Sequence, residues 1–181
     1  MPMKILLHVC CAPCLIYPLK RLREQGFEAK GFFYNPNIQP YEEYLLRYEA
    51  AVSLSKDLGF EMDYPEYSER DFTEAIDKSL PAPTRCVDCW GLRMNKTASY
   101  ARENGFDAFS STLLVSPYQD QEILKRCGEA AARKAGVSFY YEDFRSGFRE
   151  AHREAKEKGL YMQKYCGCVY SISERGGRKK R

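Results

Sequence analysis

The sequence predicts an α/β fold with a doubly wound, mainly parallel sheet in three αβα layers. Short apolar runs that are typical of buried strands alternate with longer stretches whose apolar residues follow helical spacing. Glycine follows most of the helical stretches, at the position where chains commonly leave a helix. Strand–helix–strand units connect parallel neighbours, and 181 residues are enough for one domain with a substantial core.

The individual elements follow from this pattern. The run 3–9 predicts a first strand, and helical spacing begins at Leu15 and ends at Gly26. A second strand is expected at 28–35, followed by the loop PNIQP. The remaining predictions, in order, are helix 41–58, strand 60–64, a helix capped by Ser68, helix 86–104, strand 107–114, helix 119–135, strand 137–141 and helix 147–158. Ligands of doubly wound sheets bind beyond the carboxyl ends of the strands, so the residues after the first strand are expected at a binding edge.

Charge divides the chain into a single α/β catalytic domain, 1–174, and a basic C-terminal tail, 175–181. The formal net charge is +3, but RGGRKKR carries five positive charges, so the first 174 residues sum to −2. Such a tail can hold phosphates by releasing counterions, or it can be a solvated end. Composition leaves both interpretations open.

No apolar run reaches the length of a membrane-spanning helix. Lys4 precedes the apolar ILLHV, as in a signal peptide, but His8 interrupts the run and no small-residue cleavage site follows. We therefore expect a cytoplasmic protein without a membrane partner.

Seven of the eight cysteines fall into three tight clusters, which are Cys10, Cys11 and Cys14; Cys86 and Cys89; and Cys166 and Cys168. Clusters of this kind in a cytoplasmic protein indicate metal binding or catalysis rather than a disulfide framework. Cys127 shares an apolar helical stripe and is expected to pack as a small hydrophobe.

Two of the clusters contain a C-x₂-C pair, a spacing that fits zinc, iron–sulfur or dithiol chemistry. Cys86 and Cys89 begin a predicted helix, where the helix N-terminus and nearby Arg85 and Arg93 are expected to favour thiolates. A zinc clip is one interpretation of the two pairs, although a core of this size does not need zinc to fold.

Cys166 and Cys168 flank a single glycine in KYCGCVYS. A disulfide across C-x-C closes a very small ring, so redox chemistry or metal binding is favoured over inert structure. His8 lies inside the first apolar run and is expected to be buried and hydrogen-bonded, whereas His152 is expected on the surface. No glycine-rich phosphate loop follows the first strand.

With these residues assembled, the sequence resembles the QueH family of epoxyqueuosine reductases over nearly the whole chain. The resemblance rests on five blocks, which are HVCCAPC (8–14), FFYNPNIQPYEEY (32–44), RCVDCWGLRMNKTA (85–98), STLLVSPYQD (111–120) and YCGC (165–168). It implies a fold similar to the PP-loop ATP pyrophosphatases of the HUP class. HVCCAPC replaces their SGGxDS-type loop, so ATP use is not expected.

The resemblance also implies an activity, the last step in making queuosine at the wobble position of tRNA. The epoxide of epoxyqueuosine is reduced to an alkene, and its oxygen leaves as water. The implied cofactors are a [4Fe–4S] cluster and an adjacent second metal ion, iron. The first choice of cluster ligands is Cys10, Cys11, Cys86 and Cys89. Cys166 and Cys168 are implied as a redox pair or as sharing in the second metal, and Cys14 is either a ligand of that metal or a bystander.

For the tRNA, candidate binding residues are stacking aromatics, amides that bond the base and a cation for phosphates, namely Tyr34, Tyr41, Tyr118, Asn35, Asn37 and Arg85. An electron donor is required and is not identified by the sequence. Two other functions stay open, which are a zinc-stabilised RNA-binding module and a thiol–disulfide oxidoreductase without metal.

Overall fold

The computed structural model describes residues 1–177, with side chains described through Glu174. The side chains of the expected basic tail, 175–181, lie outside that part. The strands are β1 (Lys4–His8), β2 (Glu28–Phe32), β3 (Met62–Asp63), β4 (Ala108–Ser111) and β5 (Ser138–Phe139). The α-helices are α1 (Ala12–Glu24), α2 (Tyr41–Asp57), α3 (Glu69–Ala75), α4 (Thr84–Glu103), α5 (Gln121–Ala135), α6 (Phe148–Glu157) and α7 (Val169–Gly177). Two short 3₁₀ turns, η1 (Thr112–Val115) and η2 (Phe144–Gly147), complete the described elements.

All the described strand pairs are parallel, and the strand order is β3-β2-β1-β4-β5. The chain first builds the sheet outward from β1 to β3 and then returns to the other side of β1 to add β4 and β5. The order therefore reverses between β1 and β4, and doubly wound sheets bind ligands at the carboxyl ends of the strands beside such a point. The predicted doubly wound α/β fold is confirmed.

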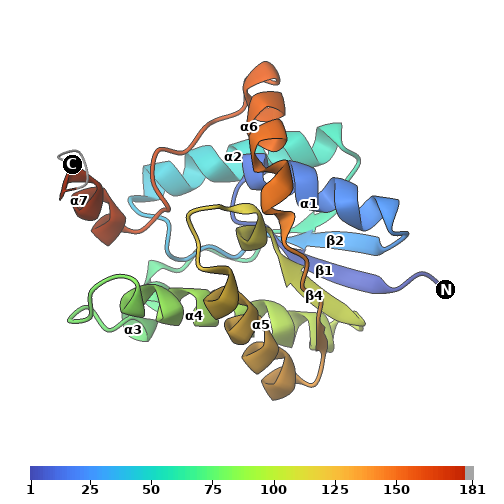
Figure 1. Ribbon diagram of the computed structural model, residues 1–181, viewed down its shortest axis with the longest axis horizontal. Coiled ribbons are helices and arrows are strands. Elements are labelled where there is room, and N and C mark those ends of the chain that lie inside the picture. Colours follow the sequence, from blue (N-terminus) through green and yellow to red (C-terminus); the bar gives the residue numbers. More distant parts are fainter. Residues whose placement is uncertain (178–181) are drawn as a thin grey trace.

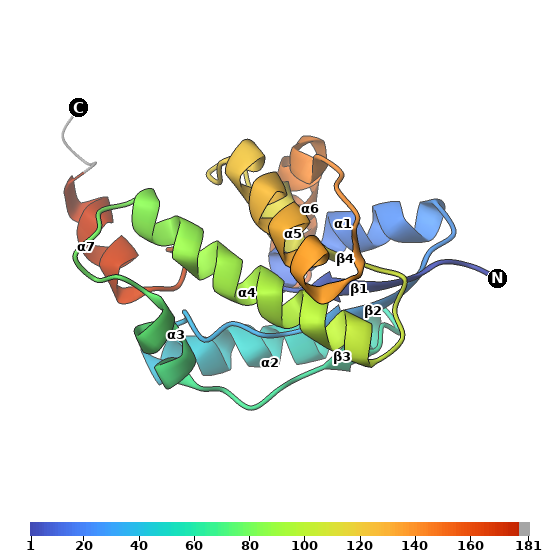
Figure 2. The same ribbon diagram turned by 90° about the horizontal axis from the view of Figure 1, so that it is seen from below.

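Helices cover both faces of the sheet (Figure 1). Alternate residues of β1 point to opposite faces, so Ile5 and Leu7 pack with residues of α1, α2 and α6. Leu6 packs with Phe109 of β4 and with residues of α4 and α5 on the other face. Figure 2 shows the same arrangement from below. Burial on both faces explains why the first strand reads as a continuous apolar run rather than an alternating one.

Several helix ends follow the predicted local chemistry. The Ser68 side chain accepts a hydrogen bond from the Asp71 amide and caps α3. Asp120 caps α5 in the same way, through the amide of Ile123. Gly136 ends α5 with φ of 70°, a left-handed conformation that glycine adopts without steric cost.

Most predicted ends shift by one to three residues, and three differences have a clear cause in the sequence. Helix α1 begins at Ala12 rather than Leu15, because a proline is tolerated in the first turn of a helix. Strand β4 ends at Ser111, whose side chain accepts a hydrogen bond from the Leu113 amide and starts the η1 turn. Helix α7 was not predicted, because its serines, glycines and β-branched residues favour helix only weakly.

Tertiary contacts explain why α7 forms. It lies beyond the carboxyl ends of the strands, on the side of the molecule opposite the N-terminus (Figure 1). Arg85 of α4 donates a hydrogen bond to the Glu174 carboxylate, and its guanidinium lies 4.3 Å from the centroid of the Tyr170 ring. Cys168, which precedes α7, packs with Phe72 of α3. Helix α7 is thus docked on α3 and α4.

Candidate metal and redox site

Strand β1 ends at the three opening cysteines. Cys10 and Cys11 follow the strand after Val9, and Cys14 lies in the first turn of α1. Their Sγ atoms lie within 4.8 Å of one another, with Cys11 and Cys14 buried and Cys10 half-buried. The Cys10 amide donates to the Thr112 hydroxyl at 3.0 Å, which connects the end of β1 to the residue after β4. The thiol group therefore lies at the point where the strand order reverses.

Hydrogen bonds distribute the protons unequally within this group. Cys10 and Cys11 have Sγ atoms 3.8 Å apart, and hydrogen bonds from Cys11 and Cys14 hold the pKa of Cys10 well below its usual range. Burial raises the pKa of Cys11, and the bonds to the other two thiols raise that of Cys14. The group therefore favours a thiolate at Cys10 and thiols at Cys11 and Cys14. A metal that binds all three sulfurs must release two protons.

The C-x₂-C pair of α4 has a different electrostatic environment. Desolvation raises the pKa of Cys89, and it raises that of Cys86 to about 11. Arg93 donates to Cys89 Sγ at 3.4 Å and opposes this rise without overcoming it. The expectation that the helix N-terminus and the arginines favour thiolates is wrong here, because the loss of water outweighs their charges. A cation would supply the missing stabilisation.

The C-G-C segment places two free thiols 3.9 Å apart. Cys166 is exposed and Cys168 is buried. A hydrogen bond from Cys168 lowers the pKa of Cys166 to about 5, and the same contact raises that of Cys168. This pair holds one thiolate and one thiol at neutral pH, the protonation pattern of a reactive dithiol.

The three clusters share one region without forming one tight group. Among the described residues, Cys10, Cys11 and Cys14 are the only group of three or more potential metal ligands whose ligand atoms all lie within 4.8 Å of one another. The negative charge of Cys166 contributes to the raised pKa of both Cys86 and Cys89, so these thiols lie within electrostatic reach of one another. Soft, buried sulfur donors that release protons fit iron or zinc better than hard cations.

The two histidines have different surroundings. His8 is fully buried, its ring nitrogens lie 3.0 Å from Ser111 Oγ and from the Tyr34 carbonyl, and burial lowers its pKa to about 4. The prediction of a buried, hydrogen-bonded His8 is confirmed. His152, predicted on the surface, is half-buried: its ring centroid lies 4.0 Å from that of Phe148, and its Nε2 is enclosed without a protein partner among the described residues.

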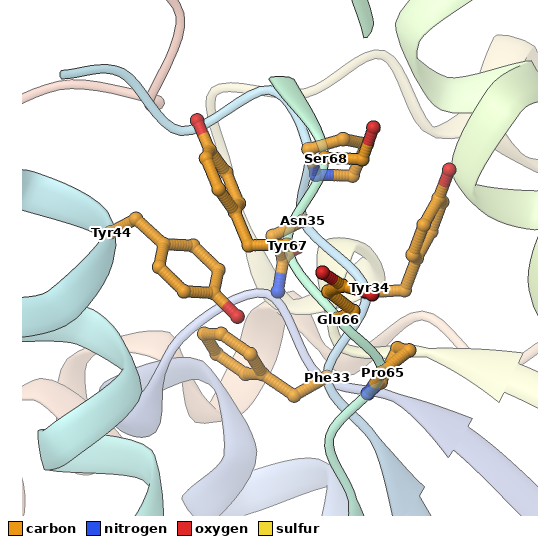
Figure 3. Close-up of a pocket in the computed structure, with 9 residues that line it drawn as sticks. Phe33, Tyr34, Asn35, Tyr44, Pro65, Glu66, Tyr67 and Ser68 are labelled. Carbon is orange, nitrogen blue, oxygen red and sulfur yellow. The ribbon is translucent and has the colours of Figure 1, made fainter. Parts of the chain in front are cut away.

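The loop after β2 carries the two predicted asparagines. Asn35 donates to the Val9 carbonyl at 2.8 Å and is thereby joined to the end of β1. The Oδ1 atoms of Asn35 and Asn37 are buried and have no hydrogen-bond partner in the described structure. Figure 3 shows Asn35 beside the rings of Tyr44 and Tyr67, at a narrow hollow that no water-sized sphere can occupy. Aromatic packing thus fixes the loop that carries both amides.

The other predicted substrate-binding residues divide by exposure. Tyr41 and Tyr118 are 51% and 84% exposed and offer a free ring. Tyr34 is buried, and its hydroxyl donates to Asp71 at 2.7 Å. Arg85 is buried and its charge is directed at Glu174.

Sequence reasoning missed several side chains that contact the sulfurs or the C-G-C segment. The Thr112 hydroxyl donates to Cys10 Sγ at 3.1 Å, and Gln163 Nε2 donates to Cys11 Sγ at 2.7 Å. Arg47 and Glu43 form a buried ion pair beside the C-G-C segment. Thr112 lies in the block STLLVSPYQD (111–120), within the strand predicted at 107–114, and this position could have indicated that its side chain is near the cysteines. Gln163 has no such signal, because its contact is with a residue 152 positions earlier.

The fold and the site together define a doubly wound α/β protein with three cysteines at the switch point of its sheet. A family model described as "Epoxyqueuosine reductase QueH" matches residues 5–174. The chain belongs to this family.

Curated relatives agree with this assignment. The Epoxyqueuosine reductase QueH of Dehalococcoides mccartyi is 40% identical over 97% of this chain and 96% of its own length. The protein of that name from Thermotoga maritima is 39% identical, over 94% of this chain and 91% of its own length. Because both matches cover nearly the full length of this chain, they include the segments that carry the three cysteine clusters.

Solved structures share the fold at low sequence identity. A structure described as a predicted subunit of tRNA methyltransferase from Methanocaldococcus jannaschii has a TM-score of 0.57, with 13% identity, covering 96% of this chain and 88% of that one. The U34-tRNA thiolase NcsA from Methanococcus maripaludis with its [4Fe-4S] cluster has a TM-score of 0.52, with 17% identity over 93% and 61%. These similarities show the fold alone. Among residues 1–177, no helix has the length and apolar character needed to cross a membrane.

Proposed function

We propose that the protein reduces epoxyqueuosine in tRNA to queuosine. The reaction adds two electrons and two protons, breaks both C–O bonds of the epoxide, forms the alkene and releases one water molecule. The observation that carries the proposal is the gathering of three thiols, two of them buried, at the switch point of this sheet, within a chain of this family. A cytoplasmic location is part of the proposal, because free thiols stay reduced there.

The sulfur donors suit the cofactors that such chemistry needs. In this proposal Cys10, Cys11, Cys86 and Cys89 hold a [4Fe–4S] cluster. Cys14 contributes to holding a second metal, iron, beside it, and Cys168 shares in that metal only as the alternative to its role in the catalytic pair. When bound, the cluster supplies electrons one at a time and the second metal acts as a Lewis acid on the epoxide oxygen. A low-potential electron-donor protein supplies the electrons from outside.

The C-G-C thiols are the catalytic pair in this proposal. Cys168 Sγ keeps a proton at neutral pH, and Cys166 Sγ is a thiolate. Their oxidation to a disulfide releases two electrons and one proton, and the second proton comes from solvent. The donor protein reduces the disulfide again. The 3.9 Å separation of the two sulfurs supports this role, since little movement is needed to form the bond.

The tRNA is bound through the residues around the cysteines. The buried Oδ1 atoms of Asn35 and Asn37, which have no partner among the described residues, accept hydrogen bonds from N–H groups of the modified base after the loop that follows β2 moves to admit it. The exposed rings of Tyr41 and Tyr118 stack on neighbouring bases. Tyr34 and Arg85 hold the site in place in this proposal, Tyr34 through its hydrogen bond to Asp71 and Arg85 through its ion pair with Glu174. The basic tail contributes contacts to phosphates.

A turnover experiment tests this function. Protein purified without oxygen is mixed with tRNA carrying epoxyqueuosine and a reductant, and the nucleosides are measured by mass spectrometry. We expect Cys166→Ser and Cys168→Ser to lose at least about 100-fold in rate, as removal of a reacting nucleophile does. Cys127→Ser is the matched control, because Cys127 is a thiol on α5 outside the three clusters.

The other outcomes separate the alternatives. Colourless protein with stoichiometric zinc and no turnover contradicts the proposal and points to a zinc-stabilised RNA-binding module. Turnover by metal-free protein points to a thiol–disulfide oxidoreductase without metal. Full turnover in both serine variants removes the catalytic role of the C-G-C pair while leaving the cluster assignment intact.

A further inference from the structure

Helix α2 carries a buried ion pair that the thiol chemistry does not itself require. Arg47 is 3% exposed, and its Nε donates to Glu43 Oε1 at 2.8 Å, one helical turn earlier. Removing two charges from water costs several kcal/mol per ion, which only close geometry and further hydrogen bonds offset. The remaining hydrogen bonds of this pair therefore indicate what it holds in place.

The free nitrogens of Arg47 bond to the segment that precedes Gly167. Nη2 donates to the Tyr165 carbonyl at 2.8 Å, and Nη1 donates to the Cys166 carbonyl at 3.0 Å. The guanidinium also lies 5.3 Å from the centroid of the Tyr165 ring. One rigid, planar group thus bonds two successive carbonyls and a carboxylate at the same time, which a lysine cannot do. Figure 1 shows the segment between α6 and α7 passing α2.

Other contacts join the same segment to the beginning of α2. Glu43 Oε2 accepts a hydrogen bond from the Tyr161 hydroxyl at 2.5 Å. The Tyr165 hydroxyl donates to the Gln39 carbonyl, and the Gln39 amide donates to the Gly167 carbonyl at 2.8 Å. Residues 161–167 are therefore held on α2 and its preceding loop by backbone and side-chain bonds together.

The close fit extends to Gly167 itself. Its φ of 132° is a conformation that other residues rarely adopt. A Cβ atom there would lie 2.9 Å from Asn37 Nδ2 and 3.3 Å from Arg47 Nη1. The backbone between the two thiols is thus packed directly against the guanidinium, and a displacement of Arg47 must move it.

We propose that Arg47 is the positioning residue of the reaction, which holds the Tyr165 and Cys166 carbonyls and so fixes the Cys166–Cys168 pair beside the other cysteines. Glu43 orients Arg47 through their ion pair and is the second positioning residue. The inference rests on the proposed function, because it assumes that the C-G-C pair reacts.

Replacement of Arg47 tests this role, and the chain offers a matched control. Arg47→Lys keeps the charge without the planar group, and Arg47→Met removes the charge. Arg23→Lys is the control, because Arg23 Nη2 also donates to two successive carbonyls, of Leu58 and Gly59, but on an exposed surface away from the C-G-C segment.

Two readouts distinguish positioning from a general loss of stability. We expect both Arg47 variants to lose about 10- to 100-fold in kcat, the usual consequence of a displaced reacting group, with KM for the tRNA within about twofold. Alkylation of Cys166 in reduced, metal-free protein should change by about threefold or more, while alkylation of Cys127 in the same samples does not change. Glu43→Gln should act in the same direction, and Arg23→Lys should match the wild type.

The inference is overturned if folded Arg47→Lys and Arg47→Met proteins keep kcat and Cys166 alkylation within about twofold of the wild type. If Arg47→Met does not fold, Arg47→Lys and Glu43→Gln decide the matter by the same two readouts. If the wild type does not convert epoxyqueuosine tRNA, the proposed function fails. The alkylation comparison then still tests whether Arg47 positions Cys166.

Discussion

The Cys166 sulfur accepts a hydrogen bond from Cys168, and this contact lowers its pKa to about 5. Alkylation requires the thiolate, so the rate at Cys166 should be nearly independent of pH between about pH 6 and 8. The Cys127 rate should instead rise about tenfold per pH unit, because burial raises the pKa of that thiol. Peptide-resolved mass spectrometry of reduced, metal-free protein measures both rates together. A tenfold rise at Cys166 from pH 6 to 7 contradicts the described contact.

His8 makes stability depend on pH. Its pKa is about 4 in the folded protein, below the ordinary 6.5. As the pH falls, the unfolded chain binds the proton first, so the contribution of His8 is complete above about pH 6.5 and is lost as the pH falls towards 4. The wild type should lose up to about 3 kcal/mol of unfolding free energy from this group over that range.

Urea unfolding of metal-free protein at a series of pH values measures this loss. His8→Gln should show a shallower decline between pH 6.5 and 4.5, whatever its stability at pH 7. His152 is the other histidine, and burial lowers its pKa by less than that of His8, so His152→Gln should change the decline less than His8→Gln does. Equal slopes in the wild type and His8→Gln would mean that His8 is protonated without penalty in the folded state.

At this scale the sequence predicted the cysteines better than their surroundings. Clustering identified Cys10, Cys11 and Cys14 as a group at the end of a strand. It did not identify Gln163, which reaches the group from a segment far along the chain. It also misjudged the charge state of the C-x₂-C pair, because desolvation depends on packing that no local pattern encodes.

Among the elements, α7 is the helix whose stability depends most clearly on contacts with other elements. Its local sequence favours helix weakly, so contacts such as that of Tyr170 with Arg85 must stabilise it. Tyr170→Ala should destabilise the docked helix by about 1–2 kcal/mol, from the lost cation–π contact and ring packing. Hydrogen exchange of the α7 amides should then accelerate by about 5- to 30-fold, while that of β1 does not change.

Ile172→Ala provides the control on the same helix, since Ile172 is 49% exposed. It should leave the exchange of α7 close to that of the wild type. Equal acceleration in the two variants would show that the contact with Arg85 does not hold the helix.

The long helices and the order of the elements were predictable because their apolar spacing is regular and glycines end them. The ends of the strands were not. Ser111 closes β4 through its own side chain, and the predicted strand over 107–114 contained no local sign of this stop. Helix α7 escaped prediction for the opposite reason, because its stability comes from other elements.

For the whole molecule, the basic tail is a prediction from sequence that lies outside the described side chains. If RGGRKKR binds phosphates, replacing its five cations with glutamine should weaken tRNA binding. The slope of log affinity against log salt should fall by about 3 to 4, as expected for five lost contacts to a single strand. Equilibrium binding at several salt concentrations measures the slope. An unchanged slope would show that the tail is a solvated end that makes no contacts with phosphates.

The doubly wound topology explains why these distant cysteines serve one region. The turn after β1, the amino end of α4 and the segment before α7 all lie at the carboxyl edge of the sheet or beyond it (Figure 1). Alternation of strands and helices was enough to predict this edge as the binding site. The pairing of α2 with the C-G-C segment was not predictable, because it joins residues more than 100 positions apart.

The proposed activity is tested most directly by following the conversion of epoxyqueuosine in tRNA, with protein that is purified without oxygen and assayed for iron and acid-labile sulfide. We expect a brown protein with about four or more irons per chain, as the proposed [4Fe–4S] cluster requires. We also expect that the nucleoside loses one oxygen atom and becomes queuosine when a reductant is present. An iron-loaded protein that binds this tRNA and leaves epoxyqueuosine unchanged would contradict the central claim.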